Sequence, residues 1–99
     1  MNNEIITTCK KYIEENNLDY LQEYYKDLLN SENLDKVDWP TIFQKLYLHA
    51  CLKGKPQTAE WFEKTLYPTM DPIQQIALRQ IFPYGKHLLS KAKPFNTIT

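Results

Sequence analysis

The chain has few of the residues that mark β-sheets or cross-linked scaffolds. It has only two glycines and two cysteines among its 99 residues. Neither glycine follows the Asn or Asp that favours a tight β-hairpin turn, and no segment alternates polar and apolar residues for long. The sequence therefore argues against a β-sheet and a disulfide framework, and it predicts an all-α fold.

The chain also has no excess of charge and no long apolar run. Twelve Lys and Arg residues balance twelve Asp and Glu residues, so the positive excess that neutralises nucleic-acid phosphates is missing. No apolar stretch approaches the roughly 20 residues of a membrane-spanning helix. Residues 2–4 are Asn-Asn-Glu, whereas a signal peptide starts with a basic and then an apolar run. We therefore expect an intracellular protein that binds neither nucleic acid nor membrane.

Cysteine and histidine do not occur at metal-binding spacings. Cys9 and Cys51 lie in predicted helices among apolar neighbours, and a reducing compartment would keep both as buried free thiols. His49 and Cys51 are two residues apart, so on a helix they point about 160° away from each other. A catalytic Cys-His pair would need His87 to meet one of the thiols in space. We predict no metal, no cofactor and no enzymatic activity.

The clearest positive signal is a pair of helices within residues 39–66. Apolar side chains recur there every three or four positions, which predicts two helices that each bury one face. Gly54 can adopt the left-handed conformation that ends a helix, and Pro56 suits a first helical turn because it needs no amide donor. So short a connection predicts a helical hairpin. The buried stripes are expected to be Trp39, Ile42, Phe43, Leu46 and Ala50 in the first helix and Ala59, Phe62 and Leu66 in the second.

Further helices are expected on both sides of this hairpin. The spacing predicts helices at residues 3–15 and 18–29, with a polar loop at 30–38. Asp71-Pro72 is typical of the start of a fifth helix. Phe82-Pro83-Tyr84-Gly85 is expected to end it before a short sixth helix at residues 86–91. The buried stripe of the fifth helix is expected to be Ile73, Ile76, Ala77 and Ile81.

These signals predict about six short helices stacked as three antiparallel hairpins. One helical domain would span residues 1–92, followed by an irregular tail at 93–99. Residues 17–25 align with 54–62 at a period of 37 residues, and such a period is typical of solenoid repeats. The last unit departs from this period. An irregular six-helix bundle, in which the aromatic matches are chance, is the alternative.

Residues 48–55, Leu-His-Ala-Cys-Leu-Lys-Gly-Lys, and 59–62, Ala-Glu-Trp-Phe, resemble an ankyrin repeat. That family reads Leu-His-x-Ala, whereas here the alanine follows His49 directly. Trp-Pro-Thr at 39–41 stands where the family has Thr-Pro, and the family's Gly-Asp hairpin tips are missing. The Asn-, Ile-, Lys- and Tyr-rich composition is similar to that of divergent ankyrin-like proteins of large DNA viruses of protists. The resemblance implies a binding or structural role and supplies no ligand residues.

Aromatic side chains are the main candidate binding residues. Seven tyrosines, four phenylalanines and two tryptophans are more than a small domain readily buries, and exposed rings commonly anchor protein interfaces. No constellation of polar groups typical of an active site is evident. The short sixth helix is expected to leave its leucines partly bare. The predicted partner-binding residues are Tyr20, Tyr24, Tyr47, Trp61, Tyr67, Tyr84, Leu88 and Leu89.

Several functions are consistent with this pattern. The first is a non-catalytic protein–protein interaction module that binds a protein partner or a second copy. The second is a structural subunit of a larger assembly, such as a small virion protein, which near-zero net charge and surplus aromatics would suit. The third, a small nucleic-acid-binding protein, would use Lys86, Lys91 and Lys93 but lacks a charge excess. No small-molecule substrate is indicated.

Overall fold

Helices account for most of residues 2–31 and 36–92, the parts of the chain that this computed structural model describes. Within these residues there is no strand, so the predicted all-α class is confirmed. The predicted tail at 93–99 and part of the predicted loop at 30–38 lie outside the described residues. The helices are α1 (Asn2–Glu14), α2 (Leu18–Leu29), α3 (Trp39–Leu52), α4 (Pro56–Glu60) and α5 (Pro72–Ala92), and α4 continues as η2 (Trp61–Leu66) and η3 (Tyr67–Thr69).

Short polar residues and one glycine set the helix boundaries. The side chains of Asn17, Asp38 and Asp71 each accept a hydrogen bond from the backbone amide three residues later, at 3.3, 3.4 and 3.0 Å. These caps satisfy amides that have no partner inside the first turn of α2, α3 and α5. Asn16 and Gly54 have φ of 59° and 69°, the left-handed conformation that lets the chain reverse after α1 and α3.

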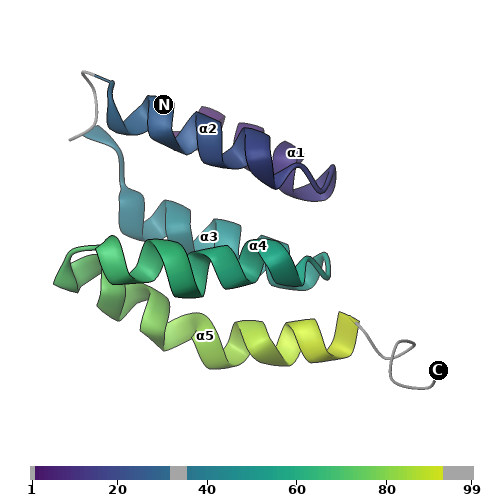
Figure 1. Ribbon diagram of the computed structural model, residues 1–99. Helices are drawn as coiled ribbons and strands as arrows, with labels where there is room; N and C mark the ends of the chain where they lie inside the picture. Colours follow the sequence, from purple (N-terminus) through teal and green to yellow (C-terminus); the bar gives the residue numbers. More distant parts are fainter. Residues whose placement is uncertain (1, 32–35, 93–99) are drawn as a thin grey trace.

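The helices form three layers (Figure 1). The first layer holds α1 and α2, the second holds α3 and α4 with its continuation, and α5 forms the third. The central helix is α3, which packs against α1 on one side and α5 on the other. The stripe residues predicted within 39–66 are all buried. Around them the core is completed by Ile5, Cys9, Ile13, Leu21, Val37, Tyr47, Cys51, Met70 and Leu78.

The second helix of the central hairpin changes its winding after Glu60. Residues Trp61–Leu66 form a π-helix and Tyr67–Thr69 a 3₁₀-helix. Trp61 packs edge-on to Tyr25 of α2 at a ring-centroid distance of 6.0 Å, and the next residue, Phe62, packs against Phe43 of α3 at 6.3 Å. The wider π-turn thus accompanies two adjacent aromatic side chains that contact two different helices.

The predicted break at residues 82–85 is wrong. α5 is one helix of 21 residues that contains Pro83, so the sixth helix and the third hairpin do not form. Proline removes one backbone hydrogen bond and its ring crowds the carbonyl of the preceding turn, which bends a helix without necessarily ending it. α5 changes direction along its length accordingly (Figure 1). The described residues therefore form five helices, not six.

The stripe predicted for the fifth helix is wrong at its first two positions. Ile73 and Ile76 are 73% and 49% exposed, whereas Leu78 is fully buried. Apolar residues occur at helical spacing on two sides of α5, which packs against α3, and the buried side is the one that contains Leu78. Aliphatic side chains are therefore exposed to solvent on the outer side of the third layer. None of the helices in the described part of the chain is long and apolar enough to span a membrane.

Candidate functional site

The structure divides the eight predicted binding residues into three groups. Tyr47 is 0% exposed, so its prediction as a partner-facing residue is wrong. Tyr20 and Tyr84 are exposed, at 61% and 58%. The others are partly buried and pack against the core, and their role in binding stays a prediction; they are Tyr24, Trp61, Tyr67, Leu88 and Leu89.

Tyr47 of α3 contacts both η2 and α5. Its hydroxyl donates a hydrogen bond to Glu63 Oε2 at 3.2 Å, and the same carboxylate group pairs with Lys86 Nζ of α5 at 3.4 Å. Burial raises the pKa of Tyr47, and the nearby Cys51 and Glu63 raise it further. Gly85 of α5 faces the Tyr47 ring. This cluster joins α3, η2 and α5.

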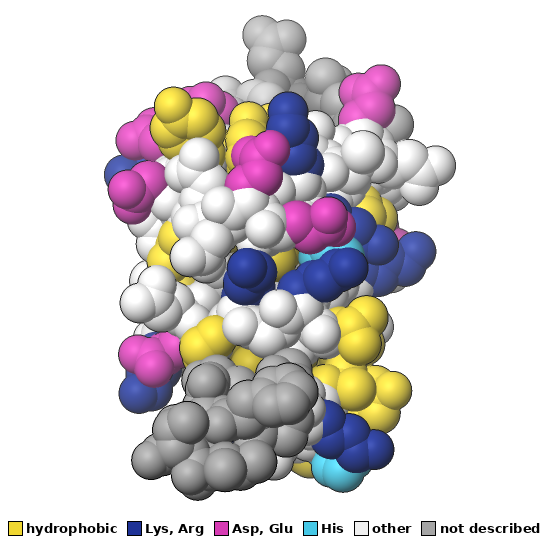
Figure 2. Space-filling view, turned by 90° about the vertical axis from the view of Figure 1, so that its right-hand side faces the viewer, with side chains coloured by type: hydrophobic (Ala, Val, Ile, Leu, Met, Phe, Trp, Pro, Cys, Tyr) yellow, Lys and Arg dark blue, Asp and Glu magenta, His cyan; other side chains and the backbone are white. Residues whose placement is uncertain are grey.

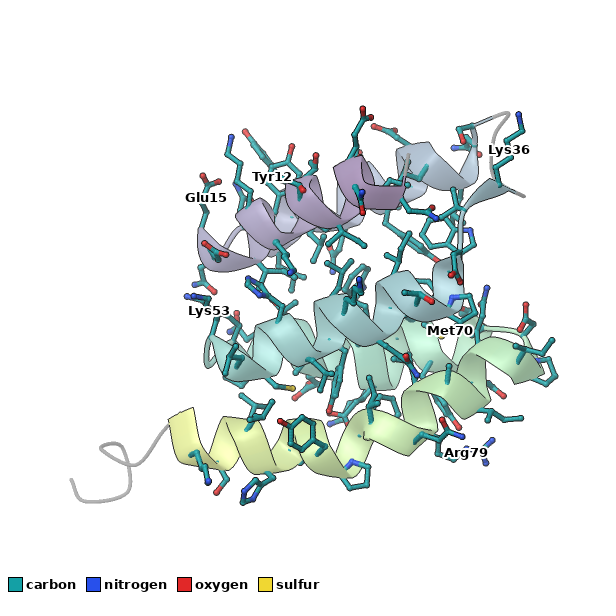
Figure 3. All side chains as sticks on the ribbon, turned by 180° about the vertical axis from the view of Figure 1, so that it is seen from behind. Tyr12, Glu15, Lys36, Lys53, Met70 and Arg79 are labelled. Atoms are coloured by element: carbon teal, nitrogen blue, oxygen red, sulfur yellow. The ribbon has the colours of Figure 1, made fainter. Side chains whose placement is uncertain are left out.

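The predicted aromatic residues do not gather in one patch. Tyr20 and Tyr24 of α2 pack edge-on to Tyr12 of α1, at 5.8 and 6.2 Å between ring centroids. Figure 3 shows Tyr12 on the outer side of the first layer. Tyr67 instead contacts Phe82 of α5 at 5.3 Å. The aromatics therefore belong to separate parts of the molecule.

A different surface brings two of the predicted residues together with side chains that the sequence analysis missed. It is an open hollow of about 420 Å³ between α3 and α5, which run in the same direction (Figure 1). Leu52 at its edge is 61% exposed. We call this surface the α3–α5 groove, and it is lined by Lys10, Lys45, Leu48, His49, Leu52, Tyr84 and Leu88.

The lining of the α3–α5 groove is apolar and basic. Lys10 and Lys45 supply its charge, and no Asp or Glu lines it. His49 Nε2 lies 2.8 Å from Glu14 Oε2, which ties α3 to α1. On the face that Figure 2 shows, hydrophobic side chains lie at the lower right beneath a band of Lys and Arg side chains. The spacing of Lys45, Leu48 and Leu52 by three and four residues was the signal that would have indicated this second face of α3.

A larger hollow of about 760 Å³ lies among the ends of α2, α3 and α5. Its lining includes Trp39 and Phe43, which are buried parts of the core. Asp71, also in its lining, caps α5. Val37 in its wall follows closely on residues 32–35, which lie outside the described chain. This hollow is therefore formed by core and helix-capping residues.

The two cysteines are free and buried. Burial raises the pKa of Cys9 to about 12 and is the main cause that raises the pKa of Cys51 to about 11. Since the thiolate is the nucleophile, such thiols are poorly reactive, and the candidate partner His87 is exposed on α5 whereas both cysteines are buried. In the described part of the chain, no three His, Cys, Asp or Glu side chains come together as metal ligands.

The buried thiols predict a loss of stability in alkali. An unfolded thiol loses its proton near the ordinary pKa of 9.0, whereas Cys9 and Cys51 in the fold keep theirs to about 12 and 11. Above pH 9 the unfolded chain binds fewer protons, so the free energy of unfolding is expected to fall as pH rises. The slope reaches about 1.4 kcal/mol per pH unit for each thiol.

Urea unfolding at pH 7, 9 and 10 measures this effect. The free energy of unfolding is expected to stay constant from pH 7 to about 8, because the thiols remain protonated there in both the folded and the unfolded chain. Cys9→Ala lowers stability at every pH but should make the decline above pH 9 shallower. A wild-type profile that stays level to pH 10 would show that the thiols ionise normally in the fold.

Comparisons of the chain with models of protein families, with curated proteins and with solved structures found no match. The geometry and chemistry of the described residues are therefore the basis for the functional conclusion.

Proposed function

We propose that this protein is a non-catalytic protein–protein interaction module and that the α3–α5 groove is its binding surface. The observation that carries the proposal is the exposure of Leu52 and Tyr84, at 61% and 58%, on either side of a hollow. Large apolar side chains grouped at a concave surface and bordered by charge are typical of interaction sites. A partner that covered both would remove this apolar surface from water.

Contacts with the core and with α1 also fix the position of the groove residues. Leu48 and Leu88 pack partly against the core, and the His49–Glu14 contact at 2.8 Å links α3 to α1. Because both walls are helices, the backbone of the groove needs little ordering when a partner binds, which lowers the entropic cost of association. Tyr84 adds an aromatic ring, the type of side chain that often contributes most to binding.

The proposal includes the resemblance of the chain to ankyrin repeats. Two pairs of helices joined by short turns, α1 with α2 and α3 with α4, support this resemblance. The single-helix third layer departs from it. The free thiols Cys9 and Cys51 suit a reducing, intracellular compartment.

The second candidate function is a structural subunit of a larger assembly, such as a small virion protein. Exposed Ile73 and Ile76 on the outer side of α5 favour it, because an assembly would cover them. The two functions are separated by whether the groove or the outer side of α5 is required for binding.

Affinity capture from cells that make the protein tests the groove. Leu52→Glu places a charge at the groove edge and is expected to lower partner recovery at least about tenfold, as expected for an interface residue of large effect. Leu29→Glu is the matched control, because Leu29 is also an exposed leucine, 42% exposed, and lies outside the groove. Far-ultraviolet circular dichroism should show both variants folded. Equal recovery by wild type and Leu52→Glu would contradict the proposal.

A further inference from the structure

The two ends of the layered fold carry opposite charge. Residues 2–31, which include α1 and α2, contain six acidic and three basic residues, whereas α5 contains three basic and no acidic residues. The zero net charge of the whole chain conceals this separation. On the face shown in Figure 2, Asp and Glu side chains lie mostly in the upper part, on the side of the first layer, and Lys and Arg predominate below.

Each end also exposes apolar surface. The outer side of the first layer carries Tyr20, 61% exposed, which packs with Tyr24 around Tyr12. The outer side of α5 carries Ile73 and Ile76, 73% and 49% exposed. Figure 3 shows Tyr12 and Arg79 on opposite outer sides of the molecule. We call these two surfaces the acidic end (Glu4, Lys11, Tyr12, Asp19, Tyr20, Glu23, Tyr24, Lys26 and Asp27, with four acidic and two basic side chains) and the basic end (Ile73, Ile76, Arg79, His87 and Lys91).

We infer that the basic end of one molecule binds the acidic end of a second copy, so that copies stack head to tail. The occupant is another copy because this chain itself supplies a surface of opposite charge that also bears exposed apolar rings. A helical layer placed on α5 would cover Ile73 and Ile76 in the way that α1 and α3 cover each other within the molecule. This inference concerns surfaces outside the α3–α5 groove and does not depend on the proposed function.

The contact is heterologous, because two different surfaces meet. A pair of bound copies therefore still leaves one acidic and one basic end unoccupied, and association continues into a filament or a closed ring. A two-fold α5–α5 dimer would instead bring the Arg79 and Lys91 side chains of the two copies together, and the acidic residue next to this surface is Asp71, which caps the first turn of α5. Charge complementarity thus favours head-to-tail stacking.

The size of the ends predicts weak association. α1 has 13 residues and is about 20 Å long, and two helices side by side, with axes about 10 Å apart, present a face about 20 Å wide. The area of such a face is about 400 Å², which is smaller than the roughly 800 Å² per partner of standard stable complexes. The assemblies should therefore grow with protein concentration and weaken with salt, which screens exposed charges beyond about 10 Å at 0.1 M.

Sedimentation and light scattering of the full chain test the inference with two apolar-to-charged variants. Ile73→Glu removes the basic end's binding surface, and Tyr20→Lys removes that of the acidic end. Wild type at roughly 0.5 mM in low salt is expected to exceed the mass of a dimer, in keeping with a weak contact between small faces. Each variant alone should be a monomer. An equimolar mixture of the two should form a dimer that grows no further, because one intact end from each variant remains.

Further outcomes distinguish the alternatives. Leu52→Glu, which alters the groove, should assemble like wild type, and Arg79→Glu should weaken assembly without removing apolar surface. Dimers of Tyr20→Lys alone, with monomeric Ile73→Glu, would show a two-fold contact through α5 and overturn head-to-tail stacking. Monomeric wild type at this concentration, or assembly unaffected by either variant, would also overturn it. Because Ile73 and Tyr20 are well exposed, both variants should fold, and circular dichroism checks this.

Discussion

Leu78→Ala is expected to lower the free energy of unfolding by about 2–5 kcal/mol, the usual cost of truncating a fully buried leucine. Ile73→Ala, in the same helix, should change it by less than about 0.5 kcal/mol. The difference arises because Leu78 is 0% exposed, whereas Ile73 is 73% exposed. The loss at Leu78 combines the transfer of the side chain to water with the cavity left behind.

Urea unfolding followed by circular dichroism measures both variants. The experiment belongs at low micromolar concentration, where association through the basic end would not contribute to the stability of Ile73. An unchanged denaturant slope would show that the compared states are the same. If Ile73→Ala cost more than Leu78→Ala, α5 would present its other side to the core, as the sequence pattern first suggested.

The central hairpin was predictable because several local signals agree there. Two apolar stripes at helical spacing flank Gly54 and Pro56, and each of these residues favours one conformation at that turn. The structure buries every predicted stripe residue between positions 39 and 66, and Gly54 has φ of 69°. The structure of such a segment can be predicted from its sequence because local propensity and tertiary packing agree.

α5 was less predictable because its decisive interactions are distant in sequence. Pro83 is a strong local signal for a helix end, but the helix continues through it. The contacts of the second half of α5, such as Lys86 with Glu63 at 3.4 Å, join residues from different layers. Likewise, the choice between the Ile73 side and the Leu78 side depends on where α3 lies, which periodicity alone does not specify.

The predicted binding residues also show that the sequence alone does not specify which side chains are buried. Composition indicated a surplus of aromatic rings, but it did not distinguish the buried Tyr47 from the exposed Tyr84. Leu52 was missed because it lies off the buried stripe of its helix. The charge of the two ends, in contrast, was already in the sequence: α5 contains no acidic residue. Counting charge helix by helix would have revealed it.

Gly85→Ala is expected to destabilise the protein by about 1–3 kcal/mol, the range for an added methyl group in a packed core. In an exposed helix the same change would stabilise, by about 1 kcal/mol, because alanine is the better helix former. Here a Cβ atom at Gly85 would lie 2.9 Å from Tyr47 Cζ and 3.0 Å from Cys51 Sγ, and closer still to Tyr47 Cε2. The Tyr47 ring is 0% exposed, and its hydroxyl is bonded to Glu63, so the ring has little room to move.

A double-mutant cycle isolates this contact. Tyr47→Leu removes the ring, so Gly85→Ala in that background should cost at least about 1 kcal/mol less than in wild type, a coupling typical of residues in direct contact. Ser90→Ala is the control, since Ser90 is exposed on the same helix and alanine there should be neutral or slightly stabilising. Stabilisation by Gly85→Ala alone would mean that α5 lies farther from α3 than the structure shows. In that case, the close approach of α5 to Tyr47 would not explain why a glycine stands in the middle of this long helix.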